Sequence, residues 1–382
     1  MKYACILLAF LILLSGCAPS QPAPETEPTV LTTAMEETEG SEPSAVAEAD
    51  PMEELFARMT VEEKVGQLFL ARCPETQAQE DISTYHLGGY ILYGRDIAGQ
   101  TPDTLLAAIT RYQLASPIPL LITVDEEGGT VCRVSSNSAF RDTPFSSPRT
   151  LYASGGMELV LSTEAEKEAL LRSLGFNVNM APVCDVTTDP GAFMYARSLG
   201  QSPEITAEFS AGTVAVMAEH QVGSVLKHFP GYGNNTDTHT SIAVDSRSLE
   251  ELESADLLPF QAGIDAGCGA VLVSHTIVNC LDDALPASLS PAVHTYLRES
   301  MGFDGVIMTD DLYMDAITDA YGAGEAAVLA VLAGNDLLCS TEYAVQYQAV
   351  LEAVETGRIP MELLDAAVWR VLQWKHELGL LF

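Results

Sequence analysis

The chain has 382 residues, of which 53 are acidic and 18 are basic, so its formal net charge at pH 7 is −35. Such an acidic protein repels the phosphate backbone, which argues against nucleic acid as a partner. Hydrophobic residues make up 47% of the chain and charged residues 19%, a composition that excludes a fully disordered protein. The length fits two or three ordinary domains, or one α/β barrel with flanking segments.

Residues 1–17 have the pattern of a secretory signal. Lys2 precedes an apolar run over residues 4–14, which is shorter than the roughly 20 residues of a membrane-spanning helix. The run leads into the letters LSGC, with Cys17 last, and this ending resembles the lipobox of bacterial lipoproteins. The resemblance implies lipidation of Cys17 and an extracytoplasmic protein anchored to the cell membrane. An ordinary signal peptide with an incidental cysteine is the alternative.

Residues 18–50 have the composition of a disordered linker. They contain five prolines and eight acidic residues, with no lysine, arginine or aromatic residue. A segment with so little apolar surface cannot offset the entropy lost on ordering. We expect it to hold the folded part away from the membrane.

The cysteines are expected to be free thiols in the core. Two of the eight belong to the signal, and the other six show no CxxC pair or metal-like spacing. An extracytoplasmic location permits disulfides, but most of these six stand in or beside apolar runs, as buried thiols do. They are Cys73, Cys132, Cys184, Cys268, Cys280 and Cys339.

Residues 51–382 alternate between short β-rich apolar runs and helical stretches, some of which lie at residues 103–114, 163–174, 205–220 and 323–332. The runs predict eight strands, at residues 66–73, 89–93, 120–125, 176–185, 224–229, 270–276, 305–310 and 336–340. Eight such units predict an α/β fold, a single (β/α)₈ TIM barrel of parallel strands. A doubly wound open sheet is the alternative, although no GxGxxG motif follows the first strand.

Polar side chains stand at the ends of several predicted strands. They are Asp125, Asp185, Lys227 with His228, His275, and Asp310 with Asp311. The carboxyl ends of barrel strands meet at one mouth, which is where barrel enzymes carry out catalysis. So many charged or imidazole groups at these ends indicate an active site rather than a purely structural role.

The segment VDEEGGTVCR follows the third predicted strand. Its paired glycines allow a tight turn, which would bring Asp125 and Arg133 to the mouth. An acid and a guanidinium suit hydrogen bonding to neighbouring hydroxyl groups. A structural salt bridge is the alternative.

The segment KHFPGYGNNTDTH begins at the end of the fifth predicted strand and continues as a polar loop. Asp237 and His239 are two residues apart, so they share a face in an extended stretch. The carboxylate would then orient the imidazole as a general acid and base. A surface loop or half of a metal site is the alternative for this pair.

The segment GVIMTDDL brings a carboxylate to the mouth on a buried strand, a placement that suits a nucleophile. Successive side chains of a strand alternate in direction, so the two adjacent acids are expected to face opposite ways. We assign Asp310 to the mouth and expect Asp311 to cap the following helix.

Together these segments resemble glycoside hydrolase family 3, in its β-N-acetylhexosaminidase branch. The resemblance covers residues 53–382, and the KHFPG loop followed by DTH is specific to that branch. The similar segments, in chain order, are TVEEKVGQLF, GGYILYGRDI, VDEEGG, APVCDV, ARSLG, KHFPGYG, DTH, TDDL and LDAAVWRVLQWKHELGL.

The resemblance implies a role for each matching residue. Asp310 corresponds to the nucleophile that forms a covalent glycosyl-enzyme, and His239 to the acid/base that Asp237 orients. The residues that bind the sugar hydroxyls correspond to Asp125, Arg133, Arg197, Lys227 and His228. The implied mechanism is retaining, with a histidine in place of the second carboxylate that most glycosidases use.

Four positions depart from the family pattern. Glu126 stands where histidine is common, Thr130 where arginine is common, and Ala196 where an acid is common. Tyr232 replaces the usual second histidine of the loop. None of these changes removes an expected catalytic group, but they bear on the group that is bound next to the sugar.

The resemblance implies a carbohydrate substrate, terminal β-linked N-acetylglucosamine on peptidoglycan fragments or chitooligosaccharides. It implies no metal and no organic cofactor, and we expect a monomer. A histidine acid/base leaves room for phosphate as acceptor, so a phosphorylase is an alternative, and a plain β-glucosidase is a weaker one.

Two further alternatives come from other classes. A sugar-binding lipoprotein would normally need two lobes and would not need Asp310. A metal-dependent barrel hydrolase would use His228, His239 and His275 as ligands, but such enzymes usually carry an HxH pair on the first strand, and residues 66–73 contain no histidine.

Overall fold

The computed structural model describes residues 50–233 and 243–382. The predicted signal peptide with Cys17, nearly all of the predicted linker, and the loop that carries Asp237 and His239 therefore lie outside the described residues. Within the described part, no helix combines the length and the apolar character that crossing a membrane requires.

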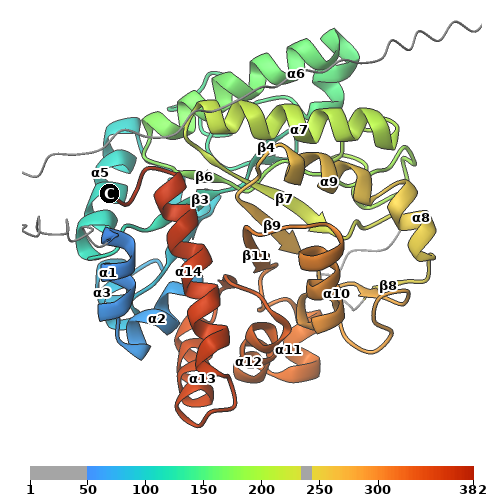
Figure 1. The fold of residues 1–382 in the computed structure, drawn as a ribbon. Helices are drawn as coiled ribbons and strands as arrows, with labels where there is room; N and C mark the ends of the chain where they lie inside the picture. Colours follow the sequence, from blue (N-terminus) through green and yellow to red (C-terminus); the bar gives the residue numbers. More distant parts are fainter. Residues whose placement is uncertain (1–49, 234–242) are drawn as a thin grey trace, which may run out of the picture. The chain divides into compact units, whose positions relative to one another are not determined.

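Eight parallel strands form a nearly closed barrel (Figure 1). Their order is β11-β9-β7-β6-β3-β2-β1-β12, and a bridge between Met308 and Leu337 joins the two ends of the sheet. This ring follows the chain order, so the predicted barrel is confirmed and the doubly wound sheet is wrong. The strands are β1 (Phe69–Arg72), β2 (Gly89–Leu92), β3 (Leu121–Val124), β6 (Val178–Asn179), β7 (Gly223–Phe229), β9 (Ala270–Val273), β11 (Val306–Thr309) and β12 (Leu338–Ser340).

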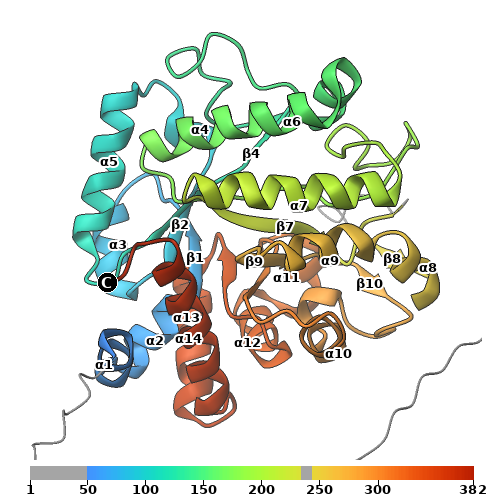
Figure 2. The same ribbon diagram turned by 45° about the horizontal axis from the view of Figure 1, so that its top comes forward.

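Helices pack around the outside of this barrel (Figure 2). They are α1 (Pro51–Arg58), α2 (Val61–Gln67), α3 (Ala78–Tyr85), α4 (Gly94–Ile97), α5 (Pro102–Ala115), α6 (Pro148–Ser173), α7 (Pro203–Glu219), α8 (Leu249–Ser254), α9 (Leu257–Asp265), α10 (Pro291–Thr295), α11 (Asp315–Tyr321), α12 (Ala323–Ala333), α13 (Tyr343–Glu355) and α14 (Met361–Glu377). A 3₁₀ turn (η1, Ala287–Leu289) and a π turn (η2, Tyr296–Ser300) flank α10.

Local sequence explains where the long helices begin. α5, α6 and α7 each start with a proline that follows a serine or threonine, whose hydroxyl accepts a hydrogen bond from a backbone N–H of the first turn. This pairing satisfies a free donor at the helix start, and proline needs no N–H there. The cap residues are Thr101, Ser147 and Ser202.

The barrel interior is filled by apolar side chains from every strand, among them Leu70, Ile91, Leu121, Val178, Val225, Leu272, Met308 and Cys339. Trp374 of α14 belongs to the same cluster and lies beside the amino ends of two strands. An added Cβ at Gly269 would come 1.9 Å from its Nε1, and one at Gly223 would come 2.9 Å from its ring. A side chain at either of these two positions would collide with the indole. The two glycines therefore allow α14 to pack across the amino end of the barrel.

All six cysteines of the described part are free, and five of them are buried. Cys280 is partly exposed. The prediction of free thiols in the core is therefore confirmed for five, and Cys280 lies at the edge of the core.

Lys375 is a fully buried amine on α14, and its Nζ donates to Gln67 Oε1 at 2.6 Å. Burial lowers its pKa to about 7, whereas an unfolded lysine has a pKa of about 10.4. The unfolded chain therefore binds more protons between these values, so stability rises with pH across that window. From pH 7 to 9 we expect this lysine to add about 2 kcal/mol to the free energy of unfolding.

Urea unfolding at both pH values checks this expectation, with Lys375→Met as the comparison. The variant should lose that part of the pH dependence. Equal pH dependence in the two proteins would show that the amine is not held in its neutral form.

Candidate active site

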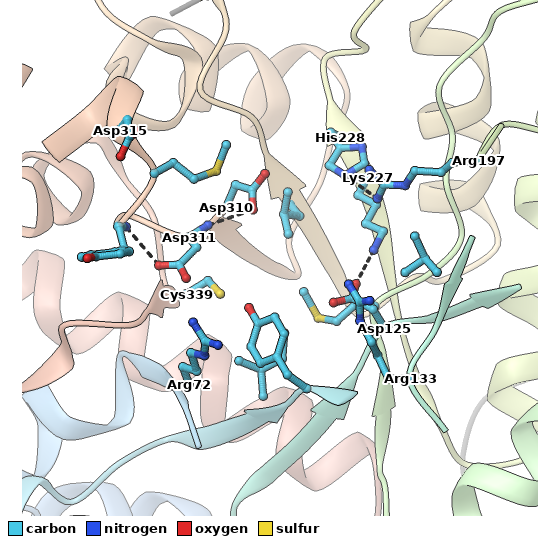
Figure 3. Close-up of a pocket in the computed structure, with 17 residues that line it drawn as sticks. Arg72, Asp125, Arg133, Arg197, Lys227, His228, Asp310, Asp311, Asp315 and Cys339 are labelled. Atoms are coloured by element: carbon cyan, nitrogen blue, oxygen red, sulfur yellow. Dashed lines mark hydrogen bonds and ion pairs between the residues drawn. The ribbon is translucent and has the colours of Figure 1, made fainter. Parts of the chain in front are cut away.

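A pocket of about 460 Å³ opens at the carboxyl ends of the barrel strands (Figure 3). It brings together six of the eight residues expected to act on substrate: Asp125, Arg133, Arg197, Lys227, His228 and Asp310. The other two, Asp237 and His239, lie outside the described residues. Apolar side chains complete the lining, among them Ile91, Met180, Leu272 and Met314.

A buried ionic cluster fixes the cationic side of the pocket. Lys227 Nζ lies 2.6 Å from Asp125 Oδ1 and 2.6 Å from Glu127 Oε1. Arg197 donates to both oxygens of Glu127, from Nε at 2.9 Å and from Nη2 at 2.7 Å. Such a two-pronged contact fixes the plane of the guanidinium as well as its position. The cluster therefore holds a carboxylate, an amine and a guanidinium in positions from which they can hydrogen-bond to hydroxyl groups.

Charge balance decides the ionisation of this cluster. Burial raises the pKa of Glu127, but Lys227 and Arg197 outweigh burial and hold that pKa well below its usual range. Burial lowers the pKa of Lys227, but Asp125 and Glu127 reverse the effect and raise it above its usual value. Glu127 and Lys227 are thus both charged at neutral pH.

Glu127 is a site residue that sequence reasoning missed. It lies on β4 (Glu126–Gly128), which pairs with β5 (Val131–Cys132) in an antiparallel hairpin. Residues two apart in an extended segment share a face, so its spacing from Asp125 was the available signal. The neighbouring Glu126 instead accepts hydrogen bonds from the backbone of Val134 and Ser135, at 2.7 and 3.2 Å, and so anchors the hairpin.

The predicted glycine turn is confirmed in the same hairpin. Gly128 and Gly129 have φ values of 96° and 67°, in the left-handed region that favours glycine. A Cβ at Gly128 would also lie 2.4 Å from the carbonyl oxygen of Ser146. Glycine at this position therefore lets the hairpin close and brings Arg133, just after β5, to the pocket.

His228 is oriented by the carboxylate of Asp185. Its Nδ1 lies 2.8 Å from Asp185 Oδ2, and its Nε2 lies 3.2 Å from Nη2 of Arg197. Because a guanidinium only donates, Nε2 is placed to accept from Arg197, and Nδ1 is placed to donate to Asp185. Asp185 also accepts from the backbone N–H of Tyr232 at 2.8 Å, and the ring of Tyr232 packs edge-on against His228.

Asp310 follows β11 directly and faces the pocket (Figure 3). Its backbone N–H donates to the carbonyl of Val273 at 3.1 Å, which ties the residue to the neighbouring strand β9. Its Oδ1 accepts from the backbone N–H of Asp311 at 2.8 Å. The expected carboxylate at the mouth is therefore held on a rigid element.

The role expected for Asp311 is wrong. α11 begins four residues later, at Asp315 with Met314 as N-cap, so Asp311 caps no helix. Its carboxylate accepts from Thr341 Oγ1 at 2.6 Å and from the backbone N–H of Tyr313 at 3.0 Å. Burial raises the pKa of this carboxyl. It also lines the pocket, because strand alternation ends where the strand does.

His275, at the end of the sixth predicted strand, is not among the residues that line the pocket. It is buried, with Nδ1 2.7 Å from Ser288 Oγ and Nε2 3.1 Å from the carbonyl oxygen of Asp311. Its place is beneath the segment that follows Asp310, where it supports the backbone.

The described part, residues 50–233 and 243–382, contains no group of three or more His, Cys, Asp or Glu side chains placed to hold a metal ion.

The model of the glycosyl hydrolase family 3 N-terminal domain matches residues 60–374. The chain belongs to glycoside hydrolase family 3. It is thus a glycoside hydrolase, and the family and the barrel expected from the sequence are both confirmed.

Relatives within the family are named β-hexosaminidases. The β-hexosaminidase LpqI of Mycobacterium tuberculosis is 31% identical over 330 residues, which cover 84% of each chain. The β-hexosaminidase of Stenotrophomonas maltophilia is 35% identical over 303 residues, which cover 75% of this chain and 88% of that one.

Solved structures agree with this placement. A family 3 β-N-acetylglucosaminidase from a Paenibacillus species superposes with a TM-score of 0.79 at 34% identity, over 84% of this chain and 63% of that chain. The M. tuberculosis LpqI structure superposes with a TM-score of 0.78 at 29% identity, over 86% of this chain and 96% of that chain.

Proposed function

We propose that the protein is a retaining β-N-acetylhexosaminidase. It removes terminal, non-reducing β-linked N-acetylglucosamine from peptidoglycan fragments or chitooligosaccharides. The observation that carries the proposal is a single pocket in which Asp310 shares the mouth of the barrel with Asp125, Lys227 and Arg197. The name of the Paenibacillus structure at 34% identity, a β-N-acetylglucosaminidase, supports the N-acetylated substrate.

The reaction proceeds by two displacements. A carboxylate oxygen of Asp310 attacks the anomeric carbon, while His239 gives a proton to the departing glycosidic oxygen. His239 then takes a proton from water, whose oxygen attacks the same carbon and releases Asp310. Two inversions return the β configuration. The roles of His239 and Asp237 rest on the family resemblance.

The described residues supply binding and electrostatics for this reaction. Asp125 accepts from sugar hydroxyls, whereas Lys227 and Arg197 donate to them, in a geometry that Glu127 holds before substrate arrives. Positioning that is complete in advance lowers the entropy cost of the reaction. A histidine as acid/base is the imidazolium before it gives its proton and neutral afterwards, so it never adds a second anion and Asp310 remains the anion that faces the positive charge developing at the anomeric carbon.

Nitrophenol release tests the proposed specificity. We expect the purified protein to hydrolyse 4-nitrophenyl β-N-acetylglucosaminide with a kcat/KM at least about a hundredfold above that for the β-glucoside, since a site built for a polar group discriminates strongly against its absence. Preference for the glucoside would contradict the proposal. Strong stimulation by phosphate, with a sugar 1-phosphate as product, would favour the phosphorylase instead.

We also propose that residues 1–17 direct export, that Cys17 carries the lipid anchor, and that residues 18–50 form the tether. The LSGC ending and the acidic, proline-rich composition support this proposal. We expect Cys17→Ala to move most of the protein from the membrane fraction to the soluble fraction, because stable anchoring depends on the acyl chains. An unchanged membrane fraction would show that the protein is held there by other means.

A further inference from the structure

Arg149, in the first turn of α6, is hydrogen-bonded to the segment between β6 and α7 that carries Arg197. Its Nε donates to the carbonyl oxygen of Tyr195 at 3.1 Å, and its Nη2 donates to that of Thr187 at 3.0 Å. Nη2 also donates to Ser198 Oγ at 3.0 Å, and Ser198 directly follows Arg197 in the chain. A side chain that is not among the residues lining the pocket therefore joins three residues of this loop.

The loop is built to receive this guanidinium. The ring of Tyr195 lies 3.7 Å from the guanidinium carbon, measured to the ring centroid, and an added Cβ at Gly200 would overlap the guanidinium. A positive charge in the first turn of a helix opposes the helix dipole, and α6 has no acidic residue in that turn to offset it. Helix stability therefore does not explain Arg149, whereas its contacts with the loop do.

The site depends on where this loop places Arg197. The Arg197 guanidinium makes the two-pronged contact with Glu127 and lies beside His228 (Figure 3). Such a contact needs the right plane as well as the right position, and a misplacement of about 1 Å in a positioned group can cost about a hundredfold in rate. Small movements of the loop would therefore reach the sugar-binding cluster.

Two sets of contacts restrain the loop. Met194 packs with Val183 and Tyr232 in one buried apolar cluster, which holds the middle of the loop. Arg149 supplies hydrogen bonds to residues on both sides of Met194 in the chain. Hydrogen bonds add direction to the apolar contact, because they fix the orientation of the groups that they join.

We propose that Arg149 is a positioning residue for Arg197. It holds residues 187–198 against α6 and so keeps the Arg197 guanidinium in contact with Glu127 and His228. The inference rests on the proposed function, in which Arg197 binds hydroxyl groups of the terminal sugar, and it adds a residue that acts through Arg197.

Hydrolysis of 4-nitrophenyl β-N-acetylglucosaminide by Arg149→Ala tests this role. We expect kcat/KM to fall by about ten- to a hundredfold, mainly through a higher KM, because a displaced Arg197 weakens sugar binding. A purely structural role would reduce the fraction of folded enzyme, which lowers the apparent kcat and leaves KM unchanged. Arg149→Lys keeps the charge without the planar fork, so its KM should lie between those of wild type and Arg149→Ala. An unchanged KM in folded Arg149→Ala would overturn the proposal.

A double-mutant cycle shows whether Arg149 acts through Arg197. If it does, removing Arg149 should have no further effect once Arg197 is absent. The kcat/KM of the double alanine variant should then match that of Arg197→Ala within about twofold. Two effects that multiply in the double variant would overturn the proposal.

Arg141→Ala is the matched control. Arg141 also lies over an aromatic ring, that of Phe145 at 4.2 Å, and donates to a loop carbonyl, that of Thr143. None of residues 134–147 lines the pocket. This variant should keep kcat/KM within about twofold of wild type, as substitutions away from the site usually do. A rise in KM equal to that of Arg149→Ala would show that the effect is not specific to the Arg197 loop.

Hydrogen exchange separates this inference from the proposed function. If wild type does not hydrolyse the nitrophenyl substrate, the proposed function is overturned, and exchange of the backbone amides of residues 187–198 still tests the loop. These amides should exchange faster in Arg149→Ala than in wild type or Arg141→Ala, because fewer contacts oppose local opening. Equal exchange would overturn the inference. If Arg149→Ala does not fold, Ser198→Ala replaces it in both experiments, since it removes the contact next to Arg197. Unchanged KM and unchanged exchange in that variant would overturn the inference.

Discussion

Asp310→Asn is expected to abolish hydrolysis, with kcat reduced by about 10⁴-fold or more. An amide cannot form the glycosyl ester, and it does not supply the negative charge that stabilises the transition state. The fold should survive. The backbone N–H of residue 310 donates to the carbonyl of Val273 in both proteins, and an amide oxygen can still accept from the backbone N–H of Asp311. Nitrophenol release measures the effect, and circular dichroism checks folding.

Asp304→Asn is the matched control for this substitution. Asp304 is an exposed acid that precedes the amino end of β11, so the change removes one charge from the other end of the same strand. It should leave kcat within about twofold, as surface substitutions away from the site usually do. Comparable loss in the two variants, or substantial activity in Asp310→Asn, would exclude Asp310 as the nucleophile.

Glu127→Gln is expected to damage both stability and substrate binding. It leaves the buried amine of Lys227 and the guanidinium of Arg197 without their shared carboxylate. Removing one partner from a buried ionic group costs about 3 to 5 kcal/mol. The same change frees both side chains to move, so kcat/KM should fall by at least about a hundredfold. Urea unfolding and steady-state kinetics measure the two effects.

Glu325→Gln provides the comparison for Glu127. Glu325 pairs with Arg358 on the surface, where the two side chains are 43% and 47% exposed. Exposed ion pairs contribute about 0 to 1 kcal/mol, so this variant should be nearly as stable as wild type and fully active. If the two variants lost similar stability, the buried cluster would not have the structural role assigned to Glu127.

The barrel could be predicted from the sequence because strand positions and burial are locally encoded. Each of the eight apolar runs coincides with a strand of the ring, and only β7 extends beyond its run, by one residue. Strands covered by helices need such continuous apolar residues. The pocket could be predicted for a related reason. Asp125 and Asp310 follow strands, and Lys227 lies near the end of another. The carboxyl ends of these strands must converge, whatever the details of the loops.

The roles of other side chains could not be predicted, because they depend on how the chain folds beyond the strand ends. The neighbouring residues do not indicate that the Asp311 carboxylate accepts a hydrogen bond from Thr341, 30 residues away. They also do not show that a turn separates Asp311 from the start of α11, so that Asp311 cannot cap this helix. His275 also follows a strand closely, as Asp310 does, yet one of its ring nitrogens is hydrogen-bonded to Ser288.

The anomeric configuration of the first product tests the central claim most directly. Proton NMR of the purified protein acting on a β-N-acetylglucosaminide, recorded before mutarotation, distinguishes the two anomers of the released sugar. Two displacements at Asp310 predict that β-N-acetylglucosamine forms first and then converts slowly to the equilibrium mixture. Initial release of the α anomer, or no release of N-acetylglucosamine, would contradict the proposed mechanism.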